Sequence, residues 1–420
     1  MDLSERLSVL RLREFRLLFC GQAVSVFGDR MVAVALAFAV LEVGGSASAV
    51  GLVLASGALA LFASLLVGGV VADRTSRRAV MVGADLVRLA SQGTMAALLI
   101  AGVADVWMLA ALAALTGAAT GFFNPASTGL LPTIVAPEHL QQANGLRATA
   151  MSSGEILGPL TAGVLVASAS AGWALAIDAA TFGISAVLLS RLRLPAGVGR
   201  ETASFRTDLK EGWSAFRSRT WVWTLVAFVA IGNMLWGAWS ALGPVVADRD
   251  LGGAAAWGTV LAAMGVGVLG GGLVATQAKP RRPLVIFALT GVVFSVPLAF
   301  LAAGAPVPLL ALAALLSGGA MMLGNSVWES TLQRHIPAES LSRVSAYDWF
   351  GSLAFYPLGL AVWGPMAAAV GLGASLWLAF ALQLATTLAL LAVPDIRRLP
   401  ATPSNGRDRP KPPVVSTSMG

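Results

Sequence analysis

Charged and tyrosine side chains are scarce in this chain, and cysteine is nearly absent. Of 420 residues only 12% are charged, two are Tyr and one is Cys, whereas 57% are hydrophobic. The single Cys20 excludes an intramolecular disulfide and a cysteine-based metal cluster. Two Tyr residues are too few for the aromatic girdles of a membrane β-barrel. With a mean hydropathy of +0.78, the composition excludes an ordinary soluble domain and predicts an all-α integral membrane protein.

Long apolar runs fill most of the chain. A helix needs about 20 apolar residues to cross a hydrocarbon core of about 30 Å, and twelve runs reach that length. The predicted spans cover residues 15–41, 48–72, 79–101, 106–127, 147–169, 172–192, 221–246, 254–277, 284–303, 306–327, 347–370 and 374–393.

The net charge is +7, which in a soluble protein would suggest nucleic acid as a partner. The positions of the charges argue against nucleic acid, because all but three of the 28 Lys and Arg residues fall in segments on one side of the predicted spans. The exceptions are Arg30 and Arg88 within spans and Arg249 on the other side. This asymmetry follows the positive-inside rule. It predicts that both termini are cytoplasmic, and we expect the inner membrane of a bacterium.

The longest connection, 193–220, separates the sixth span from the seventh. Phe205, Leu209, Trp213 and Phe216 recur there at spacings of four, four and three, which predicts an amphipathic helix along the inner leaflet. The predicted divisions are 1–14, a cytoplasmic N-terminal segment; 15–192, an N-terminal six-helix bundle; 193–220, a cytoplasmic linker; 221–393, a C-terminal six-helix bundle; and 394–420, a disordered cytoplasmic tail.

The two halves repeat each other at an offset of 201 residues. Five identities fall within the end of the fourth span, the next loop and the fifth span, matched to the tenth and eleventh spans. The pairs are Asn124 with Asn325, Leu131 with Leu332, Leu140 with Leu341, Gly158 with Gly359, and Gly163 with Gly364. Two parallel six-helix repeats that face one central cavity are the architecture of a rocking transporter.

A short polar stretch, GGVVADRTSRR at residues 68–78, joins the second and third spans. The interpretation from charge alone is that its arginines fix the topology. In a twelve-helix chain with duplicated halves, however, the pattern G-x-x-x-D-R-x-x-R-R resembles motif A of the major facilitator superfamily. The resemblance implies a gate in which Asp73, Arg74, Arg77 and Arg78 pin the inner loop to the other half. Asp348, placed at the start of the eleventh span, is either a helix cap or the partner of these arginines.

A second resemblance lies in the fifth span, where residues 154–163 read GEILGPLTAG. Gly154, Gly158, Pro159 and Gly163 resemble motif C, the antiporter signature of the same superfamily, although close helix packing alone would also favour glycines. Much of the first half resembles the drug:proton antiporter branch that includes enterobactin exporters and macrolide efflux proteins. In one departure, Ala113 replaces an arginine that many drug antiporters carry in the fourth helix, so a proton relay through that arginine is not implied.

Charged groups inside predicted spans are few, and each costs about 2.5 to 3.5 kcal/mol at mid-bilayer, so each is a functional candidate. Asp29 and Glu155 are the predicted proton-coupling acids, with a structural ion pair as the alternative for Asp29. Asp85 and Arg88 lie three residues apart, share a helix face, and are predicted to form a structural pair. Asp178 is also predicted to be structural.

The predicted substrate cavity is lined by Arg30, Asn233, Trp236 and Trp239, since the last three are mid-span residues on one helix face. Plain packing is the alternative for the two tryptophans. Trp107, Trp173 and Trp257 lie near predicted span ends, which is typical of an interfacial belt.

No grouping of serine, histidine and acid suggests catalysis, and His139 and His335 form no metal-binding pattern. Residues 265–270 match G-x-G-x-x-G but lie inside a span with no preceding strand, so we expect no nucleotide cofactor. The sequence therefore predicts a monomeric secondary transporter of major facilitator type that exports an amphipathic organic compound, an antibiotic, a siderophore or a related metabolite, by proton antiport. The alternatives are proton-coupled uptake, uniport, and a non-transporting membrane scaffold or receptor.

Overall fold

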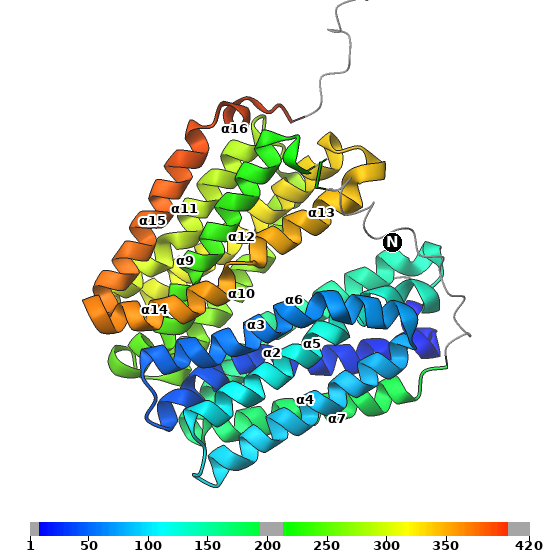
Figure 1. Cartoon of the computed structure of the whole chain (residues 1–420), viewed down its shortest axis with the longest axis vertical. Coiled ribbons are helices and arrows are strands. Elements are labelled where there is room, and N and C mark those ends of the chain that lie inside the picture. The colour runs from blue at the N-terminus through cyan, green and yellow to red at the C-terminus, as the bar shows by residue number, and fades with distance from the viewer. Residues whose placement is uncertain (1–7, 194–212, 215, 402–420) are drawn as a thin grey trace, which may run out of the picture.

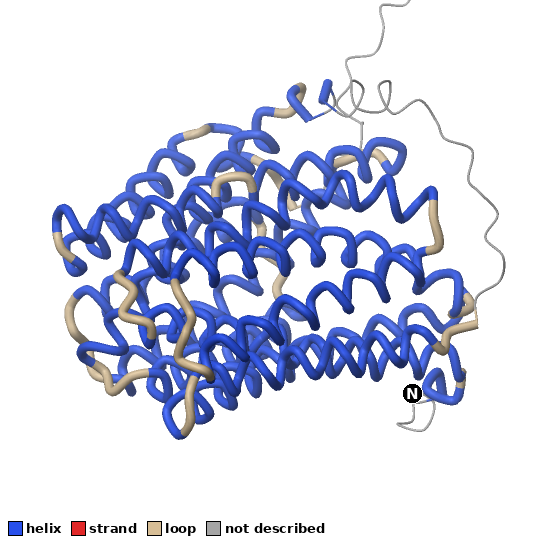
Figure 2. Tube along the Cα trace, turned by 60° about the horizontal axis from the view of Figure 1, so that its bottom comes forward, coloured by secondary structure: helices blue, strands red, loops and turns tan. Residues whose placement is uncertain are grey.

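A computed structural model describes residues 8–193, 213–214 and 216–401 of the chain. Within these ranges the regular structure is helical, with loops confined to the helix ends (Figure 2). The first half holds η1 (Ser8–Arg11), α2 (Arg13–Glu42), α3 (Ala47–Arg74), α4 (Arg77–Ile100), α5 (Val106–Ile134), η2 (Pro137–His139), α6 (Leu140–Ser168) and α7 (Ala171–Ser190). The second holds α9 (Thr220–Asp250), α10 (Ala254–Gln277), α11 (Pro283–Ala302), α12 (Val307–His335), α13 (Ala338–Leu353), α14 (Tyr356–Val370), α15 (Leu372–Ala392) and α16 (Pro394–Arg398).

Eleven spans in the described part are long and apolar enough to cross a membrane, with α13 and α14 sharing one of them. Helix α4 accounts for the remaining predicted span, 79–101, and its polar residues lower its apolar content. Asp85, Arg88, Ser91 and Gln92 are buried on this helix. The structure therefore agrees with twelve predicted spans, one of which carries charged side chains that are buried inside its bundle.

The eleventh predicted span is not one straight helix. α13 ends at Leu353 and α14 begins at Tyr356. Pro357 lies in the first turn of α14, and because proline has no N–H it cannot donate to the Leu353 carbonyl. The apolar span begins at Val344, close to its predicted start. The interpretation of Asp348 as a helix cap is wrong, because α13 starts at Ala338 and Asp348 lies well inside it.

The two halves form two bundles that meet at one end and diverge toward the end that carries the N-terminus (Figure 1). They touch mainly through α3 against α14 and α6 against α10. At the joined end one hydrophobic core runs through both halves, including Val34, Trp239 and Trp257. At the other end each half has its own core, around Leu130 in the first half and around Phe287 in the second. The bundles are thus fused at one end and independent at the other.

The glycines of the internal repeat occupy equivalent places in the two bundles. A side chain on Gly158 would collide with Arg30 on α2, and one on Gly359 would collide with the Met234 carbonyl on α9, so each glycine packs on the first helix of its own half. Gly163 lies against Ala254 on α10 and Gly364 against Ser48 on α3, so each packs on the second helix of the other half. The repeat found in the sequence is therefore a repeat of backbone contacts.

Trp257 and residues 394–398 are more buried or more ordered than the sequence predicted. Trp257, predicted for an interfacial belt, is only 2% exposed. Its ring packs against Gly243 of α9, where a side chain would collide with it. Residues 394–398, placed in a disordered tail, form α16, and Ile396 is fully buried.

In the predicted linker, Phe205 and Leu209 lie outside the described residues. Trp213 and Phe216 are helical and contact the ring of Tyr347 on α13 at centroid distances of 5.6 and 5.7 Å.

Candidate functional site

A buried charge cluster lies where α2, α4 and α7 pack together in the first half. The guanidinium of Arg88 donates through Nη2 to Asp85 Oδ1, and its Nη1 lies 3.9 Å from Asp29 Oδ2. Its Cζ sits 4.3 Å from the ring centroid of Phe123 and 4.2 Å from that of Phe182. These two rings hold the guanidinium by cation–π contact and exclude water. The predicted Asp85–Arg88 pair is thus present, and it also reaches Asp29.

The same cluster contains a third acid, Asp178. Asp85 and Asp178 are fully buried, whereas the side chain of Asp29 is 42% exposed. Thr181 Oγ1 lies 3.5 Å from Asp178 Oδ1, and Asp178 Oδ2 has no hydrogen-bond partner. Three carboxyl groups and one guanidinium therefore share this cluster, and a surplus of negative charge inside a bundle is costly. The cluster is suited to holding a proton.

Gly28 explains why α7 can bring Asp178 so close to α2. A Cβ at this position would collide with Asp178 Oδ1 and would also lie 2.5 Å from Thr181 Oγ1. Glycine leaves the space that the acid occupies. The residue before Asp29 therefore helps to assemble the cluster.

The other predicted coupling acid, Glu155, lies on α6 and pairs with Arg30. Their Oε1 and Nη2 atoms are 3.3 Å apart, with side-chain exposures of 29% and 41%. Arg30, predicted to line the substrate cavity, is therefore engaged in an ion pair between α2 and α6. Gly154 of the motif C segment packs against Val26 on α2. The backbone of Pro159 packs against Gly258 on α10, so this segment lies between its own half and the other.

The predicted gate stretch has partners in its own half. Arg77 Nη1 donates to the Gly129 carbonyl at 2.5 Å, and Arg78 Nη1 donates to the Leu192 carbonyl at 2.6 Å. Arg74 is exposed at the end of α3. The side chain of Asp73 lies outside the described part.

Asp348, the proposed partner of these arginines, is engaged within the second half. It accepts hydrogen bonds from Trp328 Nε1 at 2.9 Å and from Ser352 Oγ at 3.4 Å. In this conformation the structure does not bring it together with the arginines, and the gate stays a prediction.

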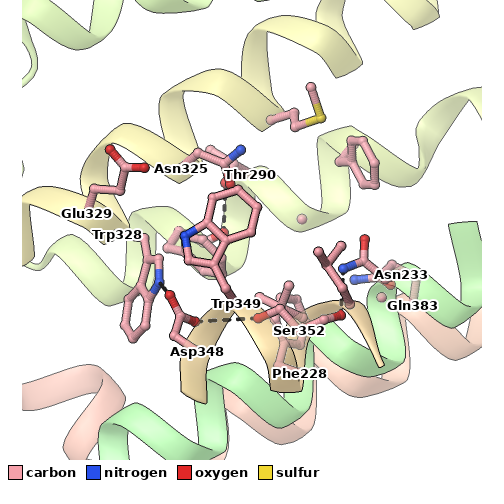
Figure 3. A pocket seen from close by; sticks show the side chains of 18 residues that line it. Phe228, Asn233, Thr290, Asn325, Trp328, Glu329, Asp348, Trp349, Ser352 and Gln383 are labelled. Carbon is pink, nitrogen blue, oxygen red and sulfur yellow. Dashed lines mark hydrogen bonds between the residues drawn. The ribbon is translucent and has the colours of Figure 1, made fainter. Parts of the chain in front are cut away.

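A pocket of about 350 Å³ opens within the second half, between α9, α11, α12, α13 and α15 (Figure 3). Predicted Asn233 is part of its wall, but its Nδ2 donates to the Ser352 carbonyl at 2.8 Å. Ser352 is in the last turn of α13, where carbonyls have no donor within the helix. Asn233 thus caps the broken helix as well as lining the pocket. The other lining residues are Phe228, Val229, Gly232, Phe287, Thr290, Gly291, Phe294, Met321, Gly324, Asn325, Trp328, Glu329, Asp348, Trp349, Ser352, Leu353 and Gln383.

The two tryptophans predicted for the cavity wall lie one layer behind it. Trp236 stacks on Phe294, which lines the pocket, with ring centroids 4.0 Å apart. Trp239 is 2% exposed and packs between Trp236 and Trp257, with centroid distances of 5.3 and 4.6 Å. Of the two interpretations, the structure favours packing for both residues.

A family model described as Major Facilitator Superfamily matches residues 18–355. This range spans the first bundle and the second as far as the break after α13. The chain belongs to this superfamily. It is therefore a membrane transporter of small molecules and not an enzyme.

Two of the relatives of this transporter are efflux proteins by name. Macrolide efflux protein A of Streptococcus pyogenes is 25% identical over 238 residues, which cover 56% of this chain and 58% of that protein. The chain thus matches little more than half the length of that relative. Multidrug efflux pump Tap of Mycolicibacterium fortuitum is 28% identical over 395 residues, which cover 89% of this chain and 93% of the pump.

Solved transporters share the fold. A mutant of the nucleoside transporter NupG aligns with a TM-score of 0.74 at 13% identity, over 91% of this chain and 99% of that one. A bacterial homologue of the human lysosomal transporter Spinster, in an inward-facing and unoccupied conformation, gives a TM-score of 0.67 at 15% identity, over 93% and 96%. At these identities the likeness concerns the fold alone.

Several pocket residues of this transporter were missed by sequence reasoning. Asn325 and Glu329 lie four residues apart on α12 and so share a face, which was a usable signal. Trp349 and Gln383 gave no comparable signal, because a single polar or aromatic residue in a span does not reveal which way it points. Only the packing of five helices makes them neighbours.

Proposed function

We propose that this transporter exports an amphipathic organic compound from a bacterial cell in exchange for protons, by alternating access, as a monomer in the inner membrane. The observation that carries the proposal is the cluster of Asp29, Asp85, Asp178 and Arg88. Acids inside membrane spans are costly, and they commonly mark ion or proton pathways. The efflux names of the relatives and the motif C resemblance support the outward direction.

Proton exchange is assigned to Asp29, with Asp178 as a further acid in the same cluster. Asp29 is the member whose side chain is exposed, at 42%, while Arg88 behind it stays buried. Ionised Asp29 is attracted to Arg88, and a proton on Asp29 removes that attraction. Because α2 packs on α6 and α7 within its half and also touches α9 and α10 of the other, a change of charge on α2 can bias how the halves sit.

Alternating access is supported by the distribution of the cores. With cytoplasmic termini, the joined end of the bundles is the outer end, and the arrangement corresponds to an inward-open state. In the opposite state the inner ends would meet, and residues 73–78 would lie at their junction. Asp348 would then have to break its hydrogen bond with Trp328 to pair with an arginine. Asp73 already lies within this stretch, so we assign the acid of the gate to Asp73.

For the gate, Asp73→Asn should reduce transport by about tenfold, the loss expected of one charge-assisted contact, with expression and thermal unfolding unchanged. Transport would be measured as efflux of a fluorescent compound from intact cells. Glu138→Gln, on the exposed η2 turn, is the matched control. Unchanged efflux by the Asp73 variant would remove the gate role.

The function is tested in proteoliposomes that carry an imposed pH gradient. A macrolide, the class named in one relative, and a panel of other amphipathic compounds would be added while a trapped pH dye reports proton movement. Antiport predicts that a transported compound drives protons in the opposite direction. Movement of both in the same direction would indicate coupled uptake, flux indifferent to the gradient would indicate uniport, and no flux of any compound would favour a scaffold.

A further inference from the structure

The pocket in the second half carries charge of one sign. Of the 18 residues that Figure 3 draws, two are carboxylic acids, Glu329 and Asp348, and none of these described lining residues is Lys, Arg or His. The two carboxylates repel each other. A positive charge placed between them would relieve that repulsion, whereas an anion would increase it.

The two acids differ in what already binds them. Asp348 is 8% exposed and accepts hydrogen bonds from Trp328 and Ser352, so it is a fixed charge in the wall. Glu329 is exposed and forms no hydrogen bond or ion pair with another described residue. It is therefore the acid that is free to meet a ligand.

Aromatic faces complete the surroundings of that charge. Five rings line the pocket, on Phe228, Phe287, Phe294, Trp328 and Trp349. The bond from Trp328 Nε1 to Asp348 fixes the indole, and Trp349 is 65% exposed. Indole faces attract cations more strongly than other aromatic rings do. Acids beside aromatic rings make a site for a cation that also has an apolar body.

We propose that this pocket binds the transported compound, and that the compound is an organic cation, a protonated or quaternary amine attached to an apolar ring system. The positive charge lies by Glu329 and Asp348, and the rings lie against Trp349 and the phenylalanines. The amides of Asn325 and Gln383 accept or donate hydrogen bonds to polar groups on that body. A volume of about 350 Å³ is within the range of pockets for drug-sized ligands. The inference rests on the proposed function only in taking the bound cation to be the compound that is carried.

The pocket is linked to the other half of the protein through contacts of α13. Trp349, Ser352 and Leu353 come from α13, and the ring of Phe350 on the same helix packs against that of Phe62 on α3 at a centroid distance of 4.6 Å. A ligand in the pocket therefore contacts a helix that touches the other half. Occupancy can change how α13 lies, and through it how the halves meet.

The test uses two probes of the same shape and opposite charge, tetraphenylphosphonium and tetraphenylborate. Binding to the purified full-length protein in detergent would be measured by equilibrium dialysis, with protein-free micelles as the partition blank. We expect saturable binding of the phosphonium and at least tenfold weaker binding of the borate. Equal or tighter binding of the borate would overturn the proposal.

Variants assign the binding to this pocket. Glu329→Gln should weaken phosphonium binding about fivefold, the upper size expected for an exposed ion pair, and Trp349→Leu about threefold through the lost cation–π contact. Glu138→Gln removes one exposed acid elsewhere and should change nothing. If Glu329→Gln and Trp349→Leu both bind like the Glu138 control, the site is elsewhere. Because no pH gradient is present, a failure of antiport would leave this result standing, and a failure here would leave antiport standing.

Discussion

The two halves of this transporter share their backbone contacts and differ in what fills them. Gly158 and Gly359 each pack on the first helix of their own half, and Gly163 and Gly364 each pack on the second helix of the other half. The first half, however, encloses an arginine among three acids, whereas the second encloses a pocket lined by amides, aromatic rings and two acids. The repeat was retained where helices must touch and diverged where side chains meet water or ligand.

This difference suggests a division of labour between the halves. The charged groups of the first half lie beside one another and can respond to protons, whereas the second half holds a pocket lined by acids and aromatic rings that can bind an organic molecule. Under the proposed function, the first half exchanges protons and the second half binds the exported compound. Substitutions that act on one task and spare the other can break or sharpen that division.

The largest effect is expected from Asp29→Asn. A pH difference of one unit is worth about 1.4 kcal/mol per proton, which sustains about a tenfold concentration ratio of substrate. Without a group that exchanges the proton, the ratio should fall to equality while phosphonium binding is kept. The measurement is substrate accumulation in proteoliposomes at a fixed pH gradient.

The matched variant for that test is Glu329→Gln in the other half. It should weaken binding and still allow uphill accumulation once substrate is raised. If Glu329→Gln abolished coupling and Asp29→Asn preserved it, the assignment of tasks to halves would be reversed.

A loss of stability should follow from Arg88→Met, because it leaves buried acids without their cation. Removing one partner of a buried pair costs about 3 to 5 kcal/mol, and the change would be read as thermal unfolding in detergent. Arg74→Met, on the exposed end of α3, is the control. Adding Asp85→Asn should recover part of the loss.

The second half supplies a contrast to Arg88. Asp348→Asn keeps an oxygen that can accept the Trp328 hydrogen bond, so its cost should be near 1 kcal/mol. Equal losses for Arg88→Met and Asp348→Asn would mean that the two interiors depend on charge to the same degree.

The fold was predictable from the sequence because its signals are local. Length and apolarity give the spans, and glycines repeat at a fixed offset because a backbone contact tolerates no side chain. The break after Leu353 was harder to predict. Pro357 causes it, yet Pro159 lies inside an unbroken α6, as do Pro125 and Pro132 in α5, so proline alone does not reveal where a membrane helix ends.

The site was predictable only in part, because it depends on how helices are rotated. Asp85 and Arg88 are neighbours on one helix, and their pairing followed from spacing. That Arg88 also reaches Asp29 depends on the packing of α2 against α4 and α7, which no local pattern specifies. Trp236 and Trp239 share a face as expected, but that face is turned into the bundle, and the pocket lies beyond Phe294.

Alanine at the paired glycines should have a smaller effect than the loss of Arg88. Overpacking costs about 1 to 3 kcal/mol. Gly359→Ala should be the worse of the two, because its Cβ would overlap the Met234 carbonyl oxygen more closely than the Cβ of Gly158→Ala would overlap Arg30 Cβ, 2.6 Å away. Thermal unfolding would rank them. Gly83→Ala and Gly270→Ala, one per half, have open space around them and should gain up to about 1 kcal/mol from helix propensity. If the paired glycines behaved like these controls, the shared backbone contacts would not be what the repeat preserves.

The smallest effect is expected at the Arg30–Glu155 pair. Its side chains are 41% and 29% exposed, and an ion pair at that exposure contributes less than about 1 kcal/mol, so Glu155→Gln should shift thermal unfolding little. Its effect on uphill transport decides whether Glu155 couples protons or only links α2 to α6. The exchange of both residues, Arg30→Glu with Glu155→Arg, separates these roles, because it keeps the pair and moves the acid to α2. Restored coupling in the exchanged protein would make Glu155 a structural partner and leave Asp29 as the coupling acid of the first half, whereas lost coupling with unchanged stability would require the carboxyl group on α6.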